Sequence, residues 1–213
     1  MNAAAARRRM VERQLRARGI EDERVLAAMA EVPREEFVPD DLRNRAYADS
    51  ALPIAAEQTI SQPWVVAAIC QALRLTGSEL VLEVGTGSGY SAAVLSLLAD
   101  HVVSIERHQA LSQSAAKILS SLEISNVELV VGDGSIGVPA RAPYDAIACH
   151  ATAPAPPDPL LEQLADSGRL VLPIAGKQAD TLTLLRRRGE GYERREIAPC
   201  RFVPLIGEEG FSG

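Results

Sequence analysis

Apolar positions before residue 80 recur at the spacing of helix turns. From residue 80 onward, short continuous apolar runs alternate with stretches of that helical spacing. In the first part this spacing predicts helices over residues 5–31, with an interruption at Gly19, and over residues 63–74. The residues between them, 33–62, have no periodic pattern and contain three prolines. A loop-rich segment of this length inside a compact chain usually has a functional role.

Short apolar segments alternate with helical stretches from Leu80 onward. The predicted strands are residues 80–84, 102–105, 127–131, 144–149 and 169–174. The predicted helices between them are residues 90–99, 109–122 and 159–165. Short strands that are mostly apolar and separated by helices are typical of a parallel sheet that is buried on both faces.

The last part of the chain has a different pattern. Residues 181–187 and 192–197 are predicted strands on either side of Gly189 and Gly191. We expect them to form an antiparallel hairpin that closes one edge of the sheet.

These elements predict an α/β fold with a doubly wound, mostly parallel sheet of the Rossmann-like type. We expect one domain over residues 1–213. Within it, residues 1–79 form an N-terminal helical and loop cap, and residues 80–213 form the α/β core.

Composition excludes several classes of protein. Of the 213 residues 47% are hydrophobic and 23% are charged, as is usual for a globular protein. A net charge of −6 argues against nucleic-acid binding, and no apolar run approaches the roughly 18 residues of a membrane span. Cys70, Cys149 and Cys200 are too widely spaced for a disulfide framework or a CxxC metal site. We expect a cytoplasmic monomer without a metal and without nucleic-acid or membrane partners.

The strongest chemical signal is the turn after the first strand of the core. The glycines of this turn follow the spacing GxGxG. A dinucleotide site has the spacing GxGxxG, which would place its third glycine at position 90, where this chain has Tyr90. An acid also stands two residues before the first glycine. This combination favours a nucleoside ligand without a pyrophosphate, namely S-adenosylmethionine, and leaves open a plain glycine-rich turn. The predicted contacts at this turn are Glu83, Gly85, Thr86, Gly87 and Gly89.

Two further acids follow the next two strands. Glu106 ends the strand at 102–105, where a carboxylate can accept both ribose hydroxyls, and Asp133 follows the strand at 127–131, where it can accept from an adenine amine. A single acid at a strand end is usually a solvated residue or a helix cap. Together with Glu83, these acids lie in register on three consecutive strands, and this arrangement supports a ligand site.

Short stretches distributed over most of the chain show a family resemblance. The most distinctive are Thr59 to Pro63 (TISQP) and Phe202 to Leu205 (FVPL). The others are residues 10–15, 32–39, 46–49, 83–90, 132–134 and 168–174. On these stretches the sequence resembles the protein-L-isoaspartate O-methyltransferase family.

The resemblance implies a repair enzyme whose partners are proteins and peptides that contain isoaspartyl residues. It would transfer a methyl group from S-adenosylmethionine to the α-carboxylate of an L-isoaspartyl residue, and the ester would then collapse to a succinimide. The family's catalytic position falls on Ser61. By the same resemblance the cofactor contacts fall on Thr59, Ile60, Ser61, Gly85, Glu106, Asp133 and Gly134, and the substrate contacts on Ala55, Ala56 and Val203.

Serine suits this chemistry. A carboxylate with an ordinary pKa near 4 is already ionised at pH 7, so the reaction needs positioning more than a general base. A hydroxyl can orient that carboxylate by donating a hydrogen bond. The competing interpretation is that Thr59 or Ser61 caps the helix that begins near Pro63.

Two segments depart from the family pattern. Ala55, Ala56 and Glu57 replace its glycines, and residues 149–154 replace its alanine-rich run. In the second segment, His150 could titrate near the cofactor, although such a histidine is more often packed or solvated. These departures leave open a methyltransferase for another dedicated carboxylate. A non-catalytic S-adenosylmethionine-binding module is the other alternative, but it would require a degraded Ser61 region, and here that region is intact. A dehydrogenase is disfavoured by Tyr90.

Overall fold

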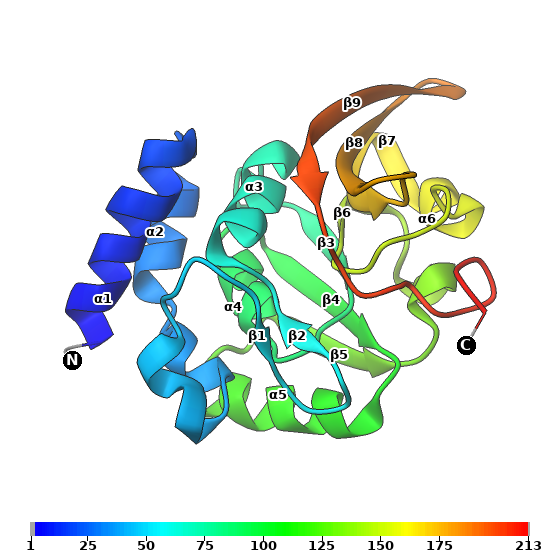
Figure 1. Ribbon diagram of the computed structural model, residues 1–213. Coiled ribbons are helices and arrows are strands. Elements are labelled where there is room, and N and C mark those ends of the chain that lie inside the picture. Colours follow the sequence, from blue (N-terminus) through cyan, green and yellow to red (C-terminus); the bar gives the residue numbers. More distant parts are fainter. Residues whose placement is uncertain (1–2, 213) are drawn as a thin grey trace.

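Seven strands form one mixed sheet in the computed structural model, which describes residues 3–212 (Figure 1). The strand order is β5-β4-β3-β6-β7-β8-β9. The first five strands in this order are parallel, and β8 and β9 are antiparallel to their neighbours. The bounds are β3 (Leu80–Val84), β4 (His101–Glu106), β5 (Val127–Val131), β6 (Tyr144–Cys149), β7 (Leu164–Ile174), β8 (Asp180–Arg188) and β9 (Gly191–Cys200). This architecture confirms the predicted doubly wound sheet with an antiparallel hairpin at its edge.

Helices cover both faces of the sheet. They are α1 (Ala3–Met10), α2 (Glu23–Glu31), α3 (Pro63–Leu73), α4 (Tyr90–Ser96), α5 (Gln109–Ser121) and α6 (Asp158–Glu162). As predicted, Gly19 interrupts the N-terminal helical stretch, with a φ of 86°. The structure also shows that Asp22 caps α2 by accepting from the N–H groups of Arg24 and Val25. A small separate hairpin, β1 (Leu52–Pro53) with β2 (Thr59–Ile60), lies in the loop-rich segment.

Each face of the sheet buries its own apolar cluster. On β3, Val81 packs into the cluster that contains residues of α1 to α5, whereas Leu82 and Val84 pack into the cluster that contains Leu160 of α6. Successive side chains of a strand point to opposite faces, so a strand between two helical layers is mostly apolar on both faces. This requirement explains why the strand pattern in the sequence is continuous rather than alternating.

The helix at α6 is shorter than its pattern predicts. The sequence favours a helix over 159–165, but α6 ends at Glu162 and β7 begins at Leu164. Leu164 pairs with Tyr144 of β6, and Ser167 takes a positive φ of 64° before the regular part of the strand. Long-range pairing with β6 therefore overrides a local helical preference at this point.

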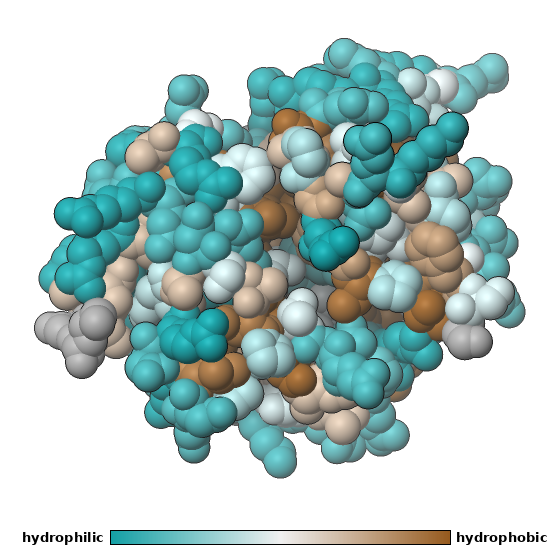
Figure 2. Space-filling model, viewed as in Figure 1, coloured by the Kyte–Doolittle hydropathy of each residue, from teal (hydrophilic) through white to brown (hydrophobic). Residues whose placement is uncertain are grey.

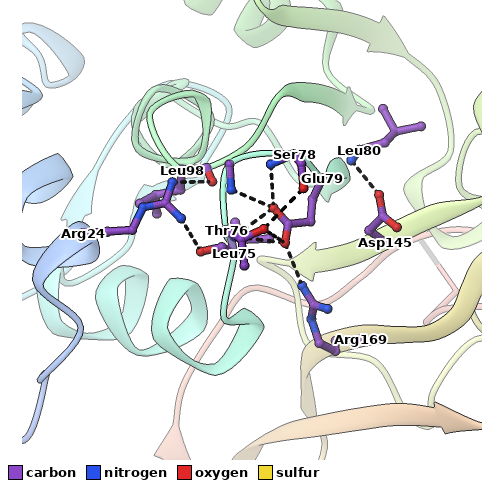
Figure 3. Close-up of polar contacts among 10 residues, drawn as sticks. Arg24, Leu75, Thr76, Ser78, Glu79, Leu80, Leu98, Asp145 and Arg169 are labelled. Carbon is purple, nitrogen blue, oxygen red and sulfur yellow. Dashed lines mark hydrogen bonds and ion pairs between the residues drawn. The ribbon is translucent and has the colours of Figure 1, made fainter.

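The Glu79 carboxylate stabilises the turn before β3, at the amino ends of the parallel strands (Figure 3). The Glu79 side chain accepts hydrogen bonds from the backbone N–H groups of Thr76, Gly77 and Ser78 and from the Thr76 hydroxyl. Burial opposes ionisation, but these donors outweigh it and hold the pKa of Glu79 below its usual range. The turn is thus stabilised by an ionised carboxylate.

Candidate active site

A pocket opens at the carboxyl ends of β3, β4 and β6, where the strand order changes direction. Segments far apart in the sequence enclose it: the end of the β1–β2 hairpin, the turn after β3 and the segment after β9. In the space-filling view this region is a hollow that both apolar and polar residues border (Figure 2). The predicted residues on its wall are Thr59, Ile60, Ser61, Gly85, Thr86, Gly87, Glu106, Gly134 and Val203.

The turn between β3 and α4 has a backbone that only glycine adopts easily. Gly85, Gly87 and Gly89 have φ angles of 92°, 54° and 89°. The N–H of Gly87 donates to Oε2 of Glu106 at 2.9 Å, and the other oxygen of Glu106 accepts from the N–H of His108 at 2.9 Å. The Glu106 carboxylate therefore fixes the turn, and it retains lone pairs for ligand hydroxyls.

Glu83 lies beneath this turn rather than on the pocket wall. Its side chain is fully buried, and Oε2 accepts a hydrogen bond from the hydroxyl of Ser104. Ser104 in turn shares a hydrogen bond with the Thr86 hydroxyl at 2.5 Å. Burial raises the pKa of Glu83 to about 8, so the carboxyl group is mostly protonated at neutral pH.

His150 stands between Glu83 and the pocket. Its Nε2 lies 2.8 Å from the Ser91 hydroxyl and 3.5 Å from Oε1 of Glu83. Burial lowers the pKa of His150 to about 4, so the imidazole is neutral at pH 7. One side of the pocket is therefore formed by the uncharged imidazole of His150, and the protonated carboxyl group of Glu83 lies behind it.

Asp133 is held by the C-terminal segment. Its Oδ1 accepts from the N–H and hydroxyl of Ser135, and its Oδ2 accepts from the N–H of Glu208 at 2.8 Å. Burial opposes ionisation, but these hydrogen bonds hold the pKa of Asp133 below its usual range. The side chain lies beside the pocket, and the neighbouring Gly134 forms part of its wall.

The segment that contains Ser61 enters the pocket from the N-terminal cap. The N-cap of α3 is Gln62, whose side chain makes no capping hydrogen bond, and Pro63 begins the helix. Neither Thr59 nor Ser61 therefore caps α3, and the competing interpretation of these residues is wrong. Instead, the backbone carbonyl of Ser61 accepts from the guanidinium of Arg34 at 2.7 Å.

The predicted substrate residues Ala55 and Ala56 lie farther out. They are exposed at the tip of the β1–β2 hairpin and do not line the pocket. Ala56 and Glu57 have positive φ angles of 55° and 56°, a conformation that glycine adopts with less strain. This geometry gives a physical reason for the glycines that the family pattern carries in this turn.

Five predicted residues thus lie off the wall of the pocket. They are Glu83 beneath the turn, Gly89 at the end of the turn where α4 begins, Asp133 beside the pocket, and Ala55 and Ala56 at the hairpin tip. Sequence reasoning missed several wall residues. They are Gln58, Val66, Val84, Ser88, Tyr90, Ser91, Ile105, Arg107, Ala151, Pro204, Leu205 and Ile206. Most are neighbours of predicted residues, so extending each motif by one or two positions would have found them.

Within residues 3–212, no group of three or more His, Cys, Asp or Glu side chains is arranged to hold a metal ion. No helix in the described part of the chain is long and apolar enough to span a membrane.

The sheet order, the glycine turn and the acid at the end of β4 define a methyltransferase of the Rossmann-like class that uses S-adenosylmethionine. Residues 6–210 match the model of the family "Protein-L-isoaspartate(D-aspartate) O-methyltransferase (PCMT)". The chain belongs to this family.

Named relatives agree with this assignment over almost the whole chain. A protein-L-isoaspartate O-methyltransferase of Herpetosiphon aurantiacus is 52% identical over 205 residues, which are 96% of this chain and 92% of that protein. One of Methanoregula boonei is 50% identical over 96% of this chain and 94% of that protein.

Solved structures agree as well. A protein-L-isoaspartate O-methyltransferase superimposes with a TM-score of 0.85 at 30% identity, over 96% of this chain and 67% of that one. A Plasmodium falciparum structure described as a beta-aspartate methyltransferase in complex with S-adenosyl-L-homocysteine has the same fold, with a TM-score of 0.81 at 22% identity over 97% of this chain and 99% of that one.

Proposed function

We propose that this protein transfers a methyl group from S-adenosylmethionine to the α-carboxylate of L-isoaspartyl residues in damaged proteins and peptides. One observation carries the proposal: the Ser61 segment and the glycine turn, which lie far apart in the sequence, line the same pocket. The family assignment supplies the substrate, and the pocket supplies places for both reactants.

The reaction joins a carboxylate oxygen to the methyl carbon while the carbon–sulfur bond breaks. The carboxylate loses its negative charge and the sulfonium loses its positive charge, so no proton moves. We assign Ser61 to orient the carboxylate by donating its hydroxyl hydrogen, which brings oxygen, methyl carbon and sulfur into line. His150 lines the pocket but is not needed as a base, because the nucleophile is already ionised.

The cofactor roles divide between direct contact and support. The site geometry favours direct contacts from Thr59, Ile60, Gly85, Glu106 and Gly134, which all line the pocket. When bound, the cofactor supplies the activated methyl group. Glu83 supports the turn from below, and Gly89 ends the turn where α4 begins. Asp133 can still accept from an adenine amine, since an ionised carboxylate has more lone pairs than its three hydrogen bonds use.

The backbone near Val203 is the proposed contact for the substrate peptide. Val203 lines the pocket, and its carbonyl already accepts from the N–H of Thr152 at 2.8 Å, which fixes its position. Ala55 and Ala56 would meet only parts of the peptide outside the pocket. The net charge of −6 further supports an enzyme that works without nucleic acid. We propose one domain that acts as a cytoplasmic monomer without a membrane partner.

Labelled methyl transfer tests the function. The protein is incubated with S-adenosylmethionine that carries a labelled methyl group and with an isoaspartyl peptide or its normal aspartyl counterpart. We expect base-labile label on the isoaspartyl peptide alone. Label on neither peptide, with cofactor binding confirmed by calorimetry, would favour another dedicated carboxylate or a non-catalytic role.

A further inference from the structure

A completely buried arginine lies behind the Ser61 segment. Arg34 has no exposed surface, and its charge is not paired, since none of the carboxylates in residues 3–212 forms an ion pair with it. A buried charge without a partner is costly, and burial lowers the pKa of Arg34, although a guanidinium remains protonated. Arginines rarely occupy such a position unless their hydrogen bonds serve the structure or the site.

The guanidinium contacts three segments. Nε donates to the carbonyl of Ala46 and Nη2 donates to the carbonyl of Ser61, each at 2.7 Å. The guanidinium carbon lies 4.7 Å from the centre of the Tyr90 ring, which it covers. Nη1 is buried and makes no hydrogen bond. One rigid side chain therefore joins the loop at 46, the Ser61 segment and the first residue of α4.

These contacts connect the two halves of the pocket. Tyr90 follows the glycine turn directly and lines the pocket, as Ser61 does. The Tyr90 ring also packs edge-on against Phe37, which lies in the same short helical turn as Arg34. The position of the Ser61 backbone relative to the glycine turn is thus set through Arg34.

We propose that Arg34 is a positioning residue for the methyl transfer: it fixes the Ser61 segment against the start of α4 so that the serine hydroxyl meets the carboxylate. This inference rests on the proposed role of Ser61. Lysine cannot replace arginine here, because one ammonium group cannot reach two separate carbonyls and lie flat on a ring at once.

The test combines Arg34→Lys with Ser61→Ala. We expect Arg34→Lys to lower kcat for the isoaspartyl peptide by about 10- to 100-fold, because small displacements of a positioning group have effects of this size. The Kd for S-adenosylmethionine should change much less. In the Ser61→Ala background the same substitution should lower kcat by less than about threefold, since residues that act as one unit are not additive.

Arg24 provides the matched control. Its guanidinium also joins two backbone carbonyls, those of Leu75 and Leu98, but at the opposite end of the sheet (Figure 3). Arg24→Lys should leave kcat unchanged, although it too loses a carbonyl bridge. Activities are compared per folded molecule, as measured by circular dichroism.

Several outcomes separate the claims. Wild-type protein without methyl transfer to the isoaspartyl peptide would overturn the proposed function. If Ser61→Ala is impaired but Arg34→Lys folds and is fully active, only the inference about Arg34 is overturned. The same holds if Arg34→Lys lowers kcat by the same factor in wild-type and in Ser61→Ala protein. If Arg34→Lys does not fold, Tyr90→Leu removes the ring beneath the guanidinium. Its effect on kcat at saturating cofactor should likewise shrink in the Ser61→Ala background, and an undiminished effect would contradict the inference.

Discussion

Replacing Glu83 by glutamine keeps the shape of a buried carboxyl group and removes its ability to ionise. Burial raises the pKa of Glu83 from an ordinary value of 4.5 to about 8 in the folded protein. The folded state therefore holds this proton more tightly than the unfolded state. The stability associated with it is fully present below pH 4.5 and is lost as the pH rises towards 8.

The magnitude follows from the width of this window. Each pKa unit corresponds to about 1.4 kcal/mol, so the interval from 4.5 to about 8 amounts to roughly 5 kcal/mol. Glutamine has no such dependence. The free energy of unfolding of Glu83→Gln minus that of wild type should therefore rise by this amount between pH 4.5 and pH 8.

Urea unfolding followed by far-ultraviolet circular dichroism across this pH range measures the difference. Titration of other groups, including His150, occurs in both proteins and largely cancels. Glu23→Gln is the control, because the hydrogen bond from Arg16 lowers the pKa of Glu23 and places its effect below pH 4.5. Its difference curve should be flat over the same range. A flat curve for Glu83→Gln would refute the reasoning, since it would mean that Glu83 is ionised in the folded protein at ordinary pH.

Two other substitutions test the packing and the electrostatics of the sheet. A Cβ on Gly134 would lie 2.7 Å from Cγ1 of Val84, so we expect Gly134→Ala to lower stability by about 1–3 kcal/mol and to weaken cofactor binding in calorimetry. Gly191→Ala, where a Cβ would meet open space, should change neither, and equal effects of the two would contradict this account. We expect Glu79→Gln to lower the free energy of unfolding at pH 7 by about 1–3 kcal/mol. The pKa of Glu79 is lowered in the folded protein. The ionised side chain therefore stabilises the fold above pH 4.5, and this contribution is lost as the pH falls through the folded pKa. The deficit should thus disappear in acid, and a deficit that persists in acid would show that the charge is not involved.

The sequence predicted the parallel core well because its central strands, β3, β4 and β6, are mostly apolar and buried on both faces. The segments at 80–84, 127–131 and 144–149 have the same bounds in the structure. The weakest prediction was the helix at 159–165, where pairing of Leu164 with Tyr144 starts a strand early. Local preference could not reveal this pairing, because it joins residues about twenty positions apart.

Prediction of the site was limited in a similar way. Motif spacing found the residues that line the turn, but it could not tell that Glu83 lies below the pocket or that Glu208 holds Asp133. Both facts depend on long-range packing. The link from Arg34 to Ser61 was likewise invisible, because its two hydrogen bonds end on backbone carbonyls, which have no signal in a sequence.

The central claim is that Ser61 acts on the reacting carboxylate and not mainly on the cofactor. Ser61→Ala separates the two when kcat for the isoaspartyl peptide is measured together with the Kd for S-adenosylmethionine. We expect kcat to fall far more than cofactor affinity, because the lost hydroxyl orients the carboxylate. Equal losses in turnover and in cofactor affinity would contradict the account and would show that Ser61 mainly builds the cofactor pocket.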